Sequence, residues 1–149
     1  MSVVTQNLTS ALAEVKAEIA RTDAKTALLL AFVGAVLAGA WTVACDLPLN
    51  VPAYVAGGLG LTLLVGAAGL LLRSVRPNIK GRHGFPLWAT LTAQEITEVA
   101  ASRDLAADIA GLSRLAVAKF TCLRRAVDAT CAGGALLILA VVFALGGAA

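Results

Sequence analysis

Nineteen consecutive residues without a charged side chain run from Thr26 to Ala44, and they follow directly on the charged segment from Glu18 to Lys25. At about 1.5 Å of rise per helical residue, this stretch comes close to the roughly 30 Å thickness of a bilayer's hydrocarbon core. The chain is therefore predicted to enter a membrane on one continuous helix that begins in water.

Two further uncharged stretches have a similar length, with 22 residues at 51–72 and 21 residues at 129–149. The chain of 149 residues is 59% hydrophobic and only 14% charged, whereas soluble domains carry about 25% charged residues. We therefore predict an all-α integral membrane protein with three transmembrane helices and a small cytoplasmic helical module. Its expected parts are a cytoplasmic amphipathic helix at 1–25 that continues into the first span at 26–44, an outer turn at 45–50, a second span at 51–72, a cytoplasmic basic loop with amphipathic helices at 73–128, and a third span at 129–149.

Local patterns indicate where helices begin and which faces they bury. Asn50 followed by Pro52 is a helix start, because asparagine caps a helix and proline is tolerated in the first turn. Thr92 with Glu95 is a capping box that opens a helix. Apolar residues recur at helical spacing, first at Leu8, Leu12, Val15 and Ile19, and later at Leu105, Ile109, Leu112, Ala116, Phe120, Leu123 and Val127. These two stripes predict that the amphipathic helices pack against each other.

The distribution of basic residues predicts the orientation. Nine Lys and Arg lie between the second and third spans, and none lies in the turn at 45–50. Positive residues stay on the cytoplasmic side of a membrane. We therefore expect the N-terminus and residues 73–128 in the cytoplasm and the C-terminus outside.

Small residues are frequent in the spans. Gly34 with Ala38 and Gly57 with Gly60 are examples from the first and second spans, and Gly133 belongs to the third. Such residues let helices approach closely in lipid. The spans are therefore expected to pack tightly, and the protein is expected to form a homo-oligomer.

Residues of catalytic and metal sites are scarce. The chain has one histidine, His83, and three cysteines without a CxxC pair, so neither a nucleophile with a base partner nor a metal site is predicted. The spans lack Asp, Glu, Lys, Arg and His, which argues against ion-coupled transport. The net charge of +3 comes without an aromatic and basic platform, so we expect no nucleic-acid partner. We predict no enzyme activity and no cofactor, and we expect the basic flanks to contact membrane lipid.

Several cations are predicted to meet near the cytoplasmic interface, where they would suit a small anionic ligand. A site of this kind gathers cations and hydrogen-bond donors at one place. The candidates are Lys25, Arg114, Lys119 and Arg124. Asp23 is expected either to accept a hydrogen bond from a sugar hydroxyl or a base amide, or to form an ion pair with Lys119 or Arg124. Surface ion pairing and lipid anchoring are the alternative roles for each of these residues.

Two blocks of the sequence resemble a known family. The first, Ala20-Arg-Thr-Asp23-Ala-Lys25-Thr-Ala27, leads into an apolar run that contains a glycine. The second lies between Leu105 and Ala126, where Leu112-Ser113 is followed by Ala116, by Lys119-Phe120 and by Leu123-Arg124 before the last span. In order and spacing the blocks are similar to the transmembrane effector domain of bacterial Pycsar antiphage systems, over about residues 5–149. Phe120 departs from that pattern, in which tyrosine is more frequent.

The resemblance implies a function in antiviral defence. In such a system a phage-activated pyrimidine nucleotide cyclase makes cyclic UMP or cyclic CMP. The effector senses the nucleotide and impairs the bacterial inner membrane, which stops growth before phage mature and is called abortive infection. The resemblance implies that Asp23, Lys25, Lys119 and Arg124 belong to the nucleotide site. Two other functions stay open from the sequence: a holin-like constitutive pore former, and a passive membrane anchor or assembly partner of a neighbouring protein.

Overall fold

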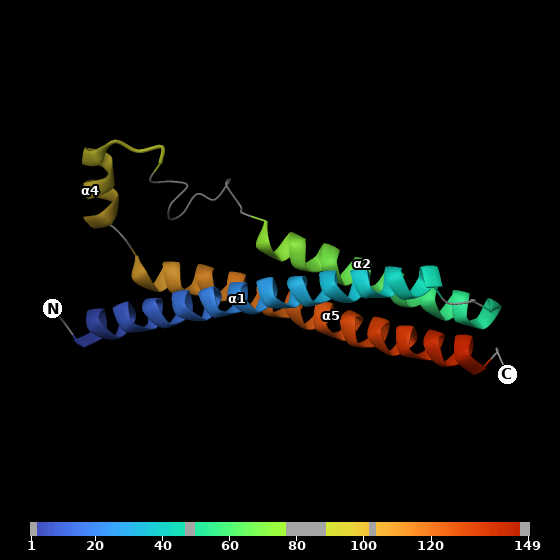
Figure 1. The fold of residues 1–149 in the computed structure, drawn as a ribbon. Coiled ribbons are helices and arrows are strands. Elements are labelled where there is room, and N and C mark those ends of the chain that lie inside the picture. The colour runs from blue at the N-terminus through green and yellow to red at the C-terminus, as the bar shows by residue number, and fades with distance from the viewer. Residues whose placement is uncertain (1–2, 47–49, 77–88, 102–103, 147–149) are drawn as a thin grey trace. The chain divides into compact units, whose positions relative to one another are not determined.

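Four α-helices account for nearly all of the protein that the computed structural model describes, which is residues 3–46, 50–76, 89–101 and 104–146. They are α1 (Val3–Asp46), α2 (Val51–Val75), α4 (Ala93–Ala101) and α5 (Leu105–Gly146), and these ranges contain no strand (Figure 1). Three of the helices, α1, α2 and α5, are long and apolar enough to cross a membrane. The predicted fold class, all-α with three membrane-compatible helices, is confirmed.

The chain divides into two compact units. Unit 1 consists of residues 1–19 and 76–116, and unit 2 consists of residues 20–75 and 117–149. Two predicted segments lie partly outside the described residues: 77–88 holds most of the predicted basic loop, and 47–49 belongs to the predicted turn.

α1 and α5 are long single helices of 44 and 42 residues. Neither contains proline, which breaks a helix interior, and both are rich in alanine. α5 begins after Asp104, whose Oδ1 accepts hydrogen bonds from the Ala106 and Ala107 N–H groups at 3.0 and 3.2 Å. This is an N-cap, because it satisfies backbone donors that lack a partner in the first helical turn. α5 then continues past Asp128, where the sequence analysis divided an amphipathic segment from the third span.

Unit 1 contains the first part of α1, all of α4 and the first part of α5. In the N-terminal stripe Leu12 is buried, and the other three apolar residues are half-buried. The predicted capping box is confirmed: the Thr92 N–H donates to Glu95 Oε2 at 2.7 Å, and the Glu95 N–H donates to Thr92 Oγ1 at 3.4 Å. Hydrogen bonds from the Thr92 backbone and then its hydroxyl hold the pKa of Glu95 below its ordinary value. This cap therefore stabilises α4 above the ordinary pKa and is lost as the pH falls through the lowered one.

The core of unit 2 is formed by side chains from the three long helices. Val33 of α1, Leu64 and Leu71 of α2, and Ala126 of α5 are fully buried together. The buried residues of α2 recur at spacings of three and four, as expected for a helix that packs along one stripe. They are Ala53, Ala56, Gly60, Leu64, Ala67 and Leu71.

The inward face of α5 in unit 2 differs from the predicted apolar stripe. Phe120 and Val127, which the stripe included, are exposed. Leu123 of the stripe stays half-buried, and the other less exposed residues include Lys119, Cys122, Ala126, Thr130 and Gly133. Of these, Ala126, Thr130 and Gly133 are buried, and small side chains of this kind allow helices to approach closely.

α2 and α5 approach most closely where Gly60 faces Gly133. A Cβ atom added to Gly133 would lie 2.9 Å from the Gly60 carbonyl oxygen and 3.0 Å from Leu64 Cγ, and one added to Gly60 would lie 2.9 Å from the Gly133 oxygen. Only glycine fits at such a distance, since a backbone atom cannot give way as the end of a side chain can. The predicted role of glycine in close helix packing therefore applies to this pair.

Side chains also connect α2 to α5 on either side of the glycine pair. Asn50 caps α2 through the Ala53 N–H, which donates to Asn50 Oδ1 at 3.0 Å, and this confirms the predicted helix start. The Asn50 Nδ2 donates to the Phe143 carbonyl oxygen in the last turns of α5 at 2.7 Å. Near the other end, Cys122 Sγ donates to the Leu70 carbonyl oxygen at 3.3 Å. The two helices are thus joined along their whole shared length.

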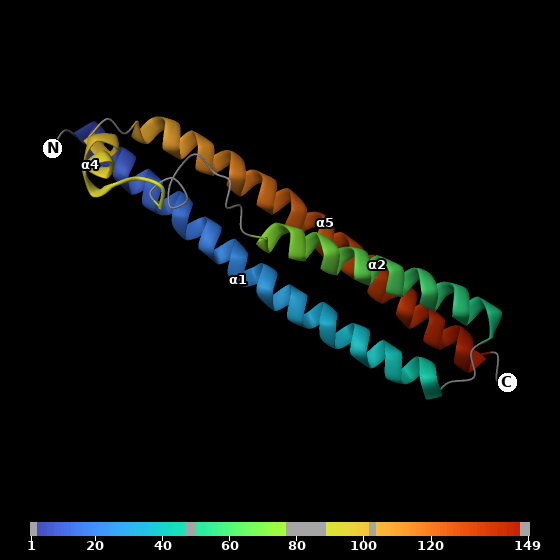
Figure 2. The ribbon, with the colours of Figure 1, turned by 90° about the horizontal axis from the view of Figure 1, so that it is seen from above.

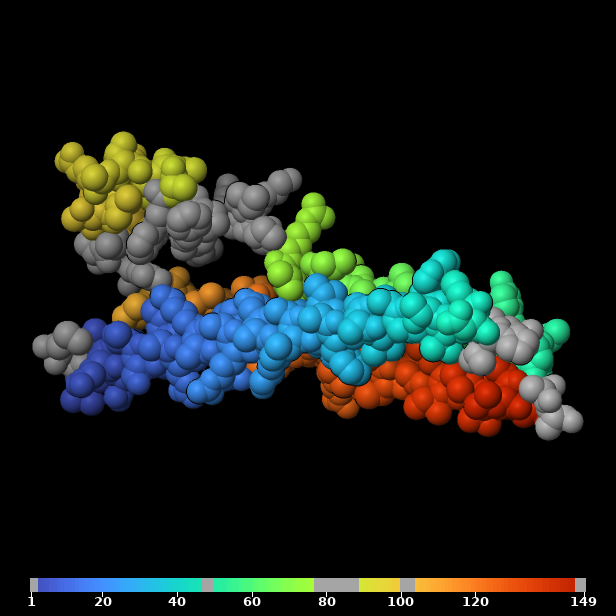
Figure 3. Space-filling model, viewed as in Figure 1, coloured from blue at the N-terminus to red at the C-terminus, as the bar shows by residue number. Residues whose placement is uncertain are grey.

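The outer surfaces of the three long helices are apolar. In the most apolar 18-residue stretch of each helix, only 6%, 28% and 22% of residues are buried for α1, α2 and α5. Large exposed side chains include Phe32, Leu59, Val65, Ile138, Val142 and Leu145. α1 and the end of α5 form the face of unit 2 that Figure 3 shows. Apolar surface on this scale is stable against lipid and unstable against water.

Gly133 and its neighbour Gly134 offer a matched pair of substitutions. Gly133→Ala should destabilise the protein by about 1–3 kcal/mol, because the added methyl group forces α2 and α5 apart. Gly134→Ala should leave stability equal or slightly higher, since a Cβ there meets nothing within 4 Å and alanine favours a helix. Thermal unfolding in one detergent, followed by circular dichroism, measures both. Equal midpoints for the two variants would contradict the glycine contact.

Candidate functional site

An ion pair between α1 and α5 lies at one end of unit 2, which we call the charged end. Lys119 Nζ lies 2.6 Å from Asp23 Oδ1, and the two residues are 96 positions apart in the chain. Lys119 and Arg124 are the two cationic partners predicted for Asp23, and the structure pairs it with Lys119. The opposite end of unit 2, at Asn50, is called the Asn50 end.

Buried threonines hold α1 against the bundle beside this ion pair. The side chains of Thr22 and Thr26 are 2% and 0% exposed. Thr26 Oγ1 donates to the Thr22 carbonyl oxygen at 2.8 Å, so its polar hydroxyl is satisfied inside its own helix. Thr22 precedes Asp23 directly in the sequence. The ion pair therefore lies on a well-packed part of α1.

The two partners of the ion pair differ in their access to solvent. The side chain of Lys119 is 19% exposed and that of Asp23 is 44% exposed. A cation withdrawn from water needs a paired anion or several hydrogen bonds to remain charged at low cost. Lys119 thus depends on Asp23, while Asp23 retains a carboxylate oxygen that is available to other donors. An anion that approaches this end would find a lysine already placed and already partly desolvated.

Ser74 adds a second polar group to the charged end. Its hydroxyl oxygen is buried and has no hydrogen-bond partner among the described residues. The usual acceptor for a helical serine is the carbonyl four residues earlier, which here is that of Leu70. That carbonyl accepts from Cys122 instead. The Ser74 hydroxyl is therefore left available, which is uncommon for a buried polar atom.

The register of α2 and α5 places Ser74 at the level of Lys119. The contact between Leu70 and Cys122 aligns the two antiparallel helices. Ser74 lies four residues beyond Leu70, and Lys119 lies three residues before Cys122, so they are about 6 Å and about 4.5 Å further along in the same direction. An available hydroxyl and a desolvated cation thus occupy one level of the bundle.

The other predicted site residues do not join this ion pair. Lys25 is exposed, and at two residues from Asp23 it lies on nearly the opposite side of α1. Arg124 is also exposed, about 140° around α5 from Lys119. Arg114 is exposed and belongs to unit 1. The geometry therefore assembles Asp23 and Lys119, while the remaining cations stay on helix surfaces.

Sequence reasoning missed Ser74, Thr22 and Thr26. A serine at the end of an apolar helix is common, so Ser74 does not stand out in the sequence. Its hydroxyl becomes notable only because Cys122 donates a hydrogen bond to the Leu70 carbonyl oxygen. The two threonines form an i, i+4 pair beside Asp23, which was a signal available in the sequence. Among the described residues, no cluster of His, Cys, Asp and Glu could hold a metal ion.

These features define a class: a helical membrane protein of three apolar spans with a polar, ion-paired site at one end of the bundle. Residues 7–146 match the family described as the Pycsar effector protein domain. The chain therefore belongs to the Pycsar effector family, and the resemblance of its two blocks is confirmed. It is a membrane protein of Pycsar antiphage defence, and it is linked to cyclic nucleotide signalling. No curated protein and no solved structure matches the chain.

A double-mutant cycle measures the ion pair. Asp23→Asn and Lys119→Met should each destabilise the protein, and the double variant should lose less than the sum, with a coupling energy of about 1–2 kcal/mol. The reason is that either single change leaves the other charge partly desolvated and unpaired. Thermal or urea unfolding in detergent gives the four free energies. Asp23→Asn with Lys25→Met is the control and should show a coupling near zero; equal coupling in both cycles would refute the pairing.

Proposed function

We propose that a cyclic pyrimidine mononucleotide, cyclic UMP or cyclic CMP, binds at the charged end of unit 2 and activates the protein to impair the bacterial inner membrane, which causes abortive infection. The observation that supports this most is the ion pair between Asp23 and Lys119. Each residue belongs to one of the two sequence blocks that resemble the Pycsar effectors, and these blocks come together at this contact.

The chemistry of the charged end suits a cyclic nucleotide. Its phosphodiester carries one negative charge, and a lysine ammonium binds such a group through a charge-assisted hydrogen bond. In this proposal the phosphate replaces Asp23 as the ion-pair partner of Lys119 and accepts a further hydrogen bond from the Ser74 hydroxyl. The freed Asp23 carboxylate then accepts from a ribose hydroxyl or an amine of the base. Lys25 and Arg124, exposed on the same unit, raise the local concentration of the anion.

Exchange of partners at Lys119 would change how α1 and α5 are held together. The ion pair joins two helices that both continue into apolar spans. A ligand shifts an equilibrium only through its different affinity for two states. Here the state with Lys119 bound to phosphate lacks the direct contact between the helices. The apolar spans of α1 and α5 that follow the ion pair can then change their packing, and we propose that this change damages the membrane.

The proposal also assigns partners and orientation. A pyrimidine nucleotide cyclase supplies the nucleotide, and the effector acts as a homo-oligomer rather than as an enzyme. The charged end and the N-terminus face the cytoplasm, where the nucleotide is made, and the C-terminus lies outside. The nine Lys and Arg between the second and third predicted spans support this orientation.

Nucleotide-dependent leakage tests the function directly. Protein reconstituted into vesicles of phosphatidylethanolamine and phosphatidylglycerol should release a trapped dye when cyclic UMP or cyclic CMP is added, and not without it. Lys119→Ala should abolish the response, whereas Arg124→Ala should only weaken it, because Arg124 attracts the anion without joining the ion pair. Ser74→Ala should raise the nucleotide concentration for half-maximal release by roughly tenfold, the effect of one lost hydrogen bond to a charged group.

The matched control is Arg125→Ala, which removes another exposed cation of α5 and should weaken the response no more than Arg124→Ala does. Asp23→Asn should leak partly without nucleotide, because Lys119 no longer has its partner. Dye release that is independent of nucleotide in the unchanged protein would favour a holin-like pore. The absence of release under all conditions would favour a passive anchor.

Reporter fusions test the orientation. A periplasmically active reporter should be inactive when it is fused at the N-terminus or within residues 77–88, and active when it is fused at the C-terminus. A cytoplasmically fluorescent reporter should give the reverse pattern. A result that placed residues 77–88 on the opposite side from the N-terminus would end the proposal, because the site residues of α1 and α5 would no longer share one face of the membrane with the nucleotide.

A further inference from the structure

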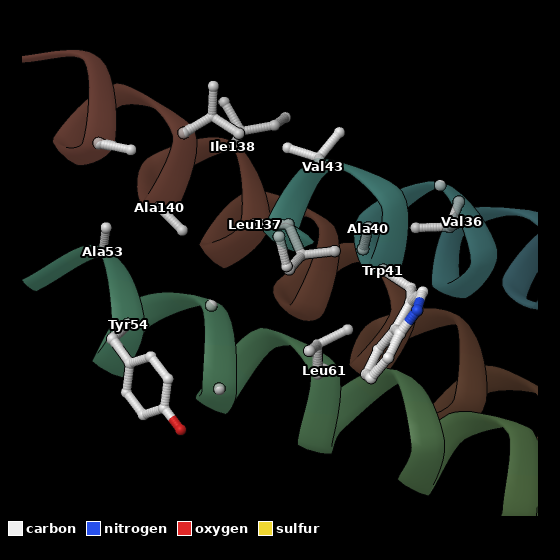
Figure 4. Close-up of a pocket in the computed structure, with 16 residues that line it drawn as sticks. Val36, Ala40, Trp41, Val43, Ala53, Tyr54, Leu61, Leu137, Ile138 and Ala140 are labelled. Carbon is white, nitrogen blue, oxygen red and sulfur yellow. The ribbon is translucent and has the colours of Figure 1, made fainter. Parts of the chain in front are cut away.

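We propose that a groove at the Asn50 end of unit 2 binds one acyl chain of a membrane phospholipid. The groove has a volume of ≈ 510 Å³ and lies between α1 on one side and the joined helices α2 and α5 on the other (Figure 4). This volume is in the range of about 300–1,000 Å³ that is usual for small-molecule sites. The inference does not depend on the nucleotide site.

The lining of the groove favours hydrocarbon over water. It consists of aliphatic residues, glycines and two aromatic residues, and none of the lining residues is ionisable apart from Tyr54. Figure 4 shows the Tyr54 ring on the side of α2 away from Ala40 and Leu137, so its hydroxyl does not point into the groove. A trapped water molecule needs two to four polar partners, which this lining does not offer. In a bilayer the groove fills with apolar matter.

The groove exists because α1 leaves the other two helices at this end. Every residue of α1 from Trp41 to Asp46 is exposed. α2 and α5, in contrast, stay together through the Asn50 contact with Phe143 and the facing glycines 60 and 133. Figure 2 shows α2 lying over α5 while the last part of α1 runs apart from them. Small residues line the space left between them, and Gly39, Gly57, Gly58 and Ala144 are among them.

The length of the groove identifies the occupant. On α1 it runs from Val36 to Ala44, which is eight residue steps or about 12 Å. One leaflet of the hydrocarbon core is about 15 Å thick, half of the roughly 30 Å total. Towards the charged end the groove is closed by the core around Val33 and Leu64. A single acyl chain from the leaflet at the Asn50 end fits this space, whereas a transmembrane helix of a second copy would need a groove along the whole bundle.

Two aromatic residues place the mouth of the groove near the membrane surface. Trp41 and Tyr54 both belong to its lining, and both are largely exposed. Tryptophan and tyrosine prefer the level of the lipid headgroups. The acyl chain would therefore enter at the level where these two residues meet the glycerol region, and its methyl end would point towards Val36.

Quenching of Trp41 by a brominated lipid tests the proposal. Trp88→Phe leaves Trp41 as the one tryptophan of the chain. The protein is reconstituted in vesicles of phosphatidylethanolamine and phosphatidylglycerol with increasing fractions of phosphatidylcholine whose acyl chains carry bromine. A bound chain quenches Trp41 with a curve that saturates at a low lipid fraction, whereas boundary lipid alone gives a steady, unsaturated decrease.

Two glycines of α2 provide the matched variants. Gly58 lines the groove and Gly66 does not, and a Cβ at either position meets nothing within 4 Å. Gly58→Leu should abolish the saturating part of the quenching curve, because its side chain occupies the space that the acyl chain would fill. Gly66→Leu should leave the curve unchanged, and Gly39→Leu repeats the block from α1.

Three results would overturn the inference. Unsaturated quenching in the protein without glycine substitutions would show that the groove holds no bound chain. Equal effects of Gly58→Leu and Gly66→Leu would show that quenching does not report on the groove. Protection of Trp41 from bromine at all lipid fractions would show that protein, such as a second copy, fills it. Circular dichroism of each variant confirms that helix content is kept.

Discussion

The backbone contact between Gly60 and Gly133 is the constraint on which the rest of unit 2 depends. In lipid, helices gain little from burying apolar side chains, so close packing and a few hydrogen bonds must hold them together. A Cβ on either glycine would lie only 2.9 Å from the opposite carbonyl oxygen, so α2 and α5 can approach this closely only because both positions are glycine. The contacts of Leu70 with Cys122 and of Asn50 with Phe143 then follow from the same register.

The part of α1 that belongs to unit 2 is held by different means at its two ends, and this difference separates the two sites. At the charged end it is fixed by Thr22, Thr26 and the ion pair of Asp23 with Lys119. At the Asn50 end its side chains are exposed and a groove separates it from its neighbours. The charged end and the groove therefore lie at opposite ends of this part of α1.

The spans and helix starts could be predicted from the sequence, because they depend on local features. An uncharged run as long as Thr26 to Ala44 is not stable in water, so it indicates a membrane span. The Asn50 cap and the capping box of Thr92 and Glu95 each involve residues that are close in the sequence. The role of Ser74 could not be predicted, since it depends on which carbonyl Cys122 reaches across the bundle. Of the chain's 14 glycines, only the register shows that Gly60 faces Gly133. The groove depends on where α1 diverges from α2 and α5, and no local sequence pattern predicts that point.

The Asn50 amide satisfies two helix ends at once. Its oxygen accepts from an N–H group of the first turn of α2, and its nitrogen donates to Phe143, one of the last four carbonyls of α5, which have no partner within their own helix. Fraying of the last turn of α5 therefore removes a hydrogen bond that also orients the cap of α2. Unfolding of one of these helix ends therefore weakens the other end as well. A single side chain thus couples two helix ends that lie 93 positions apart in the chain.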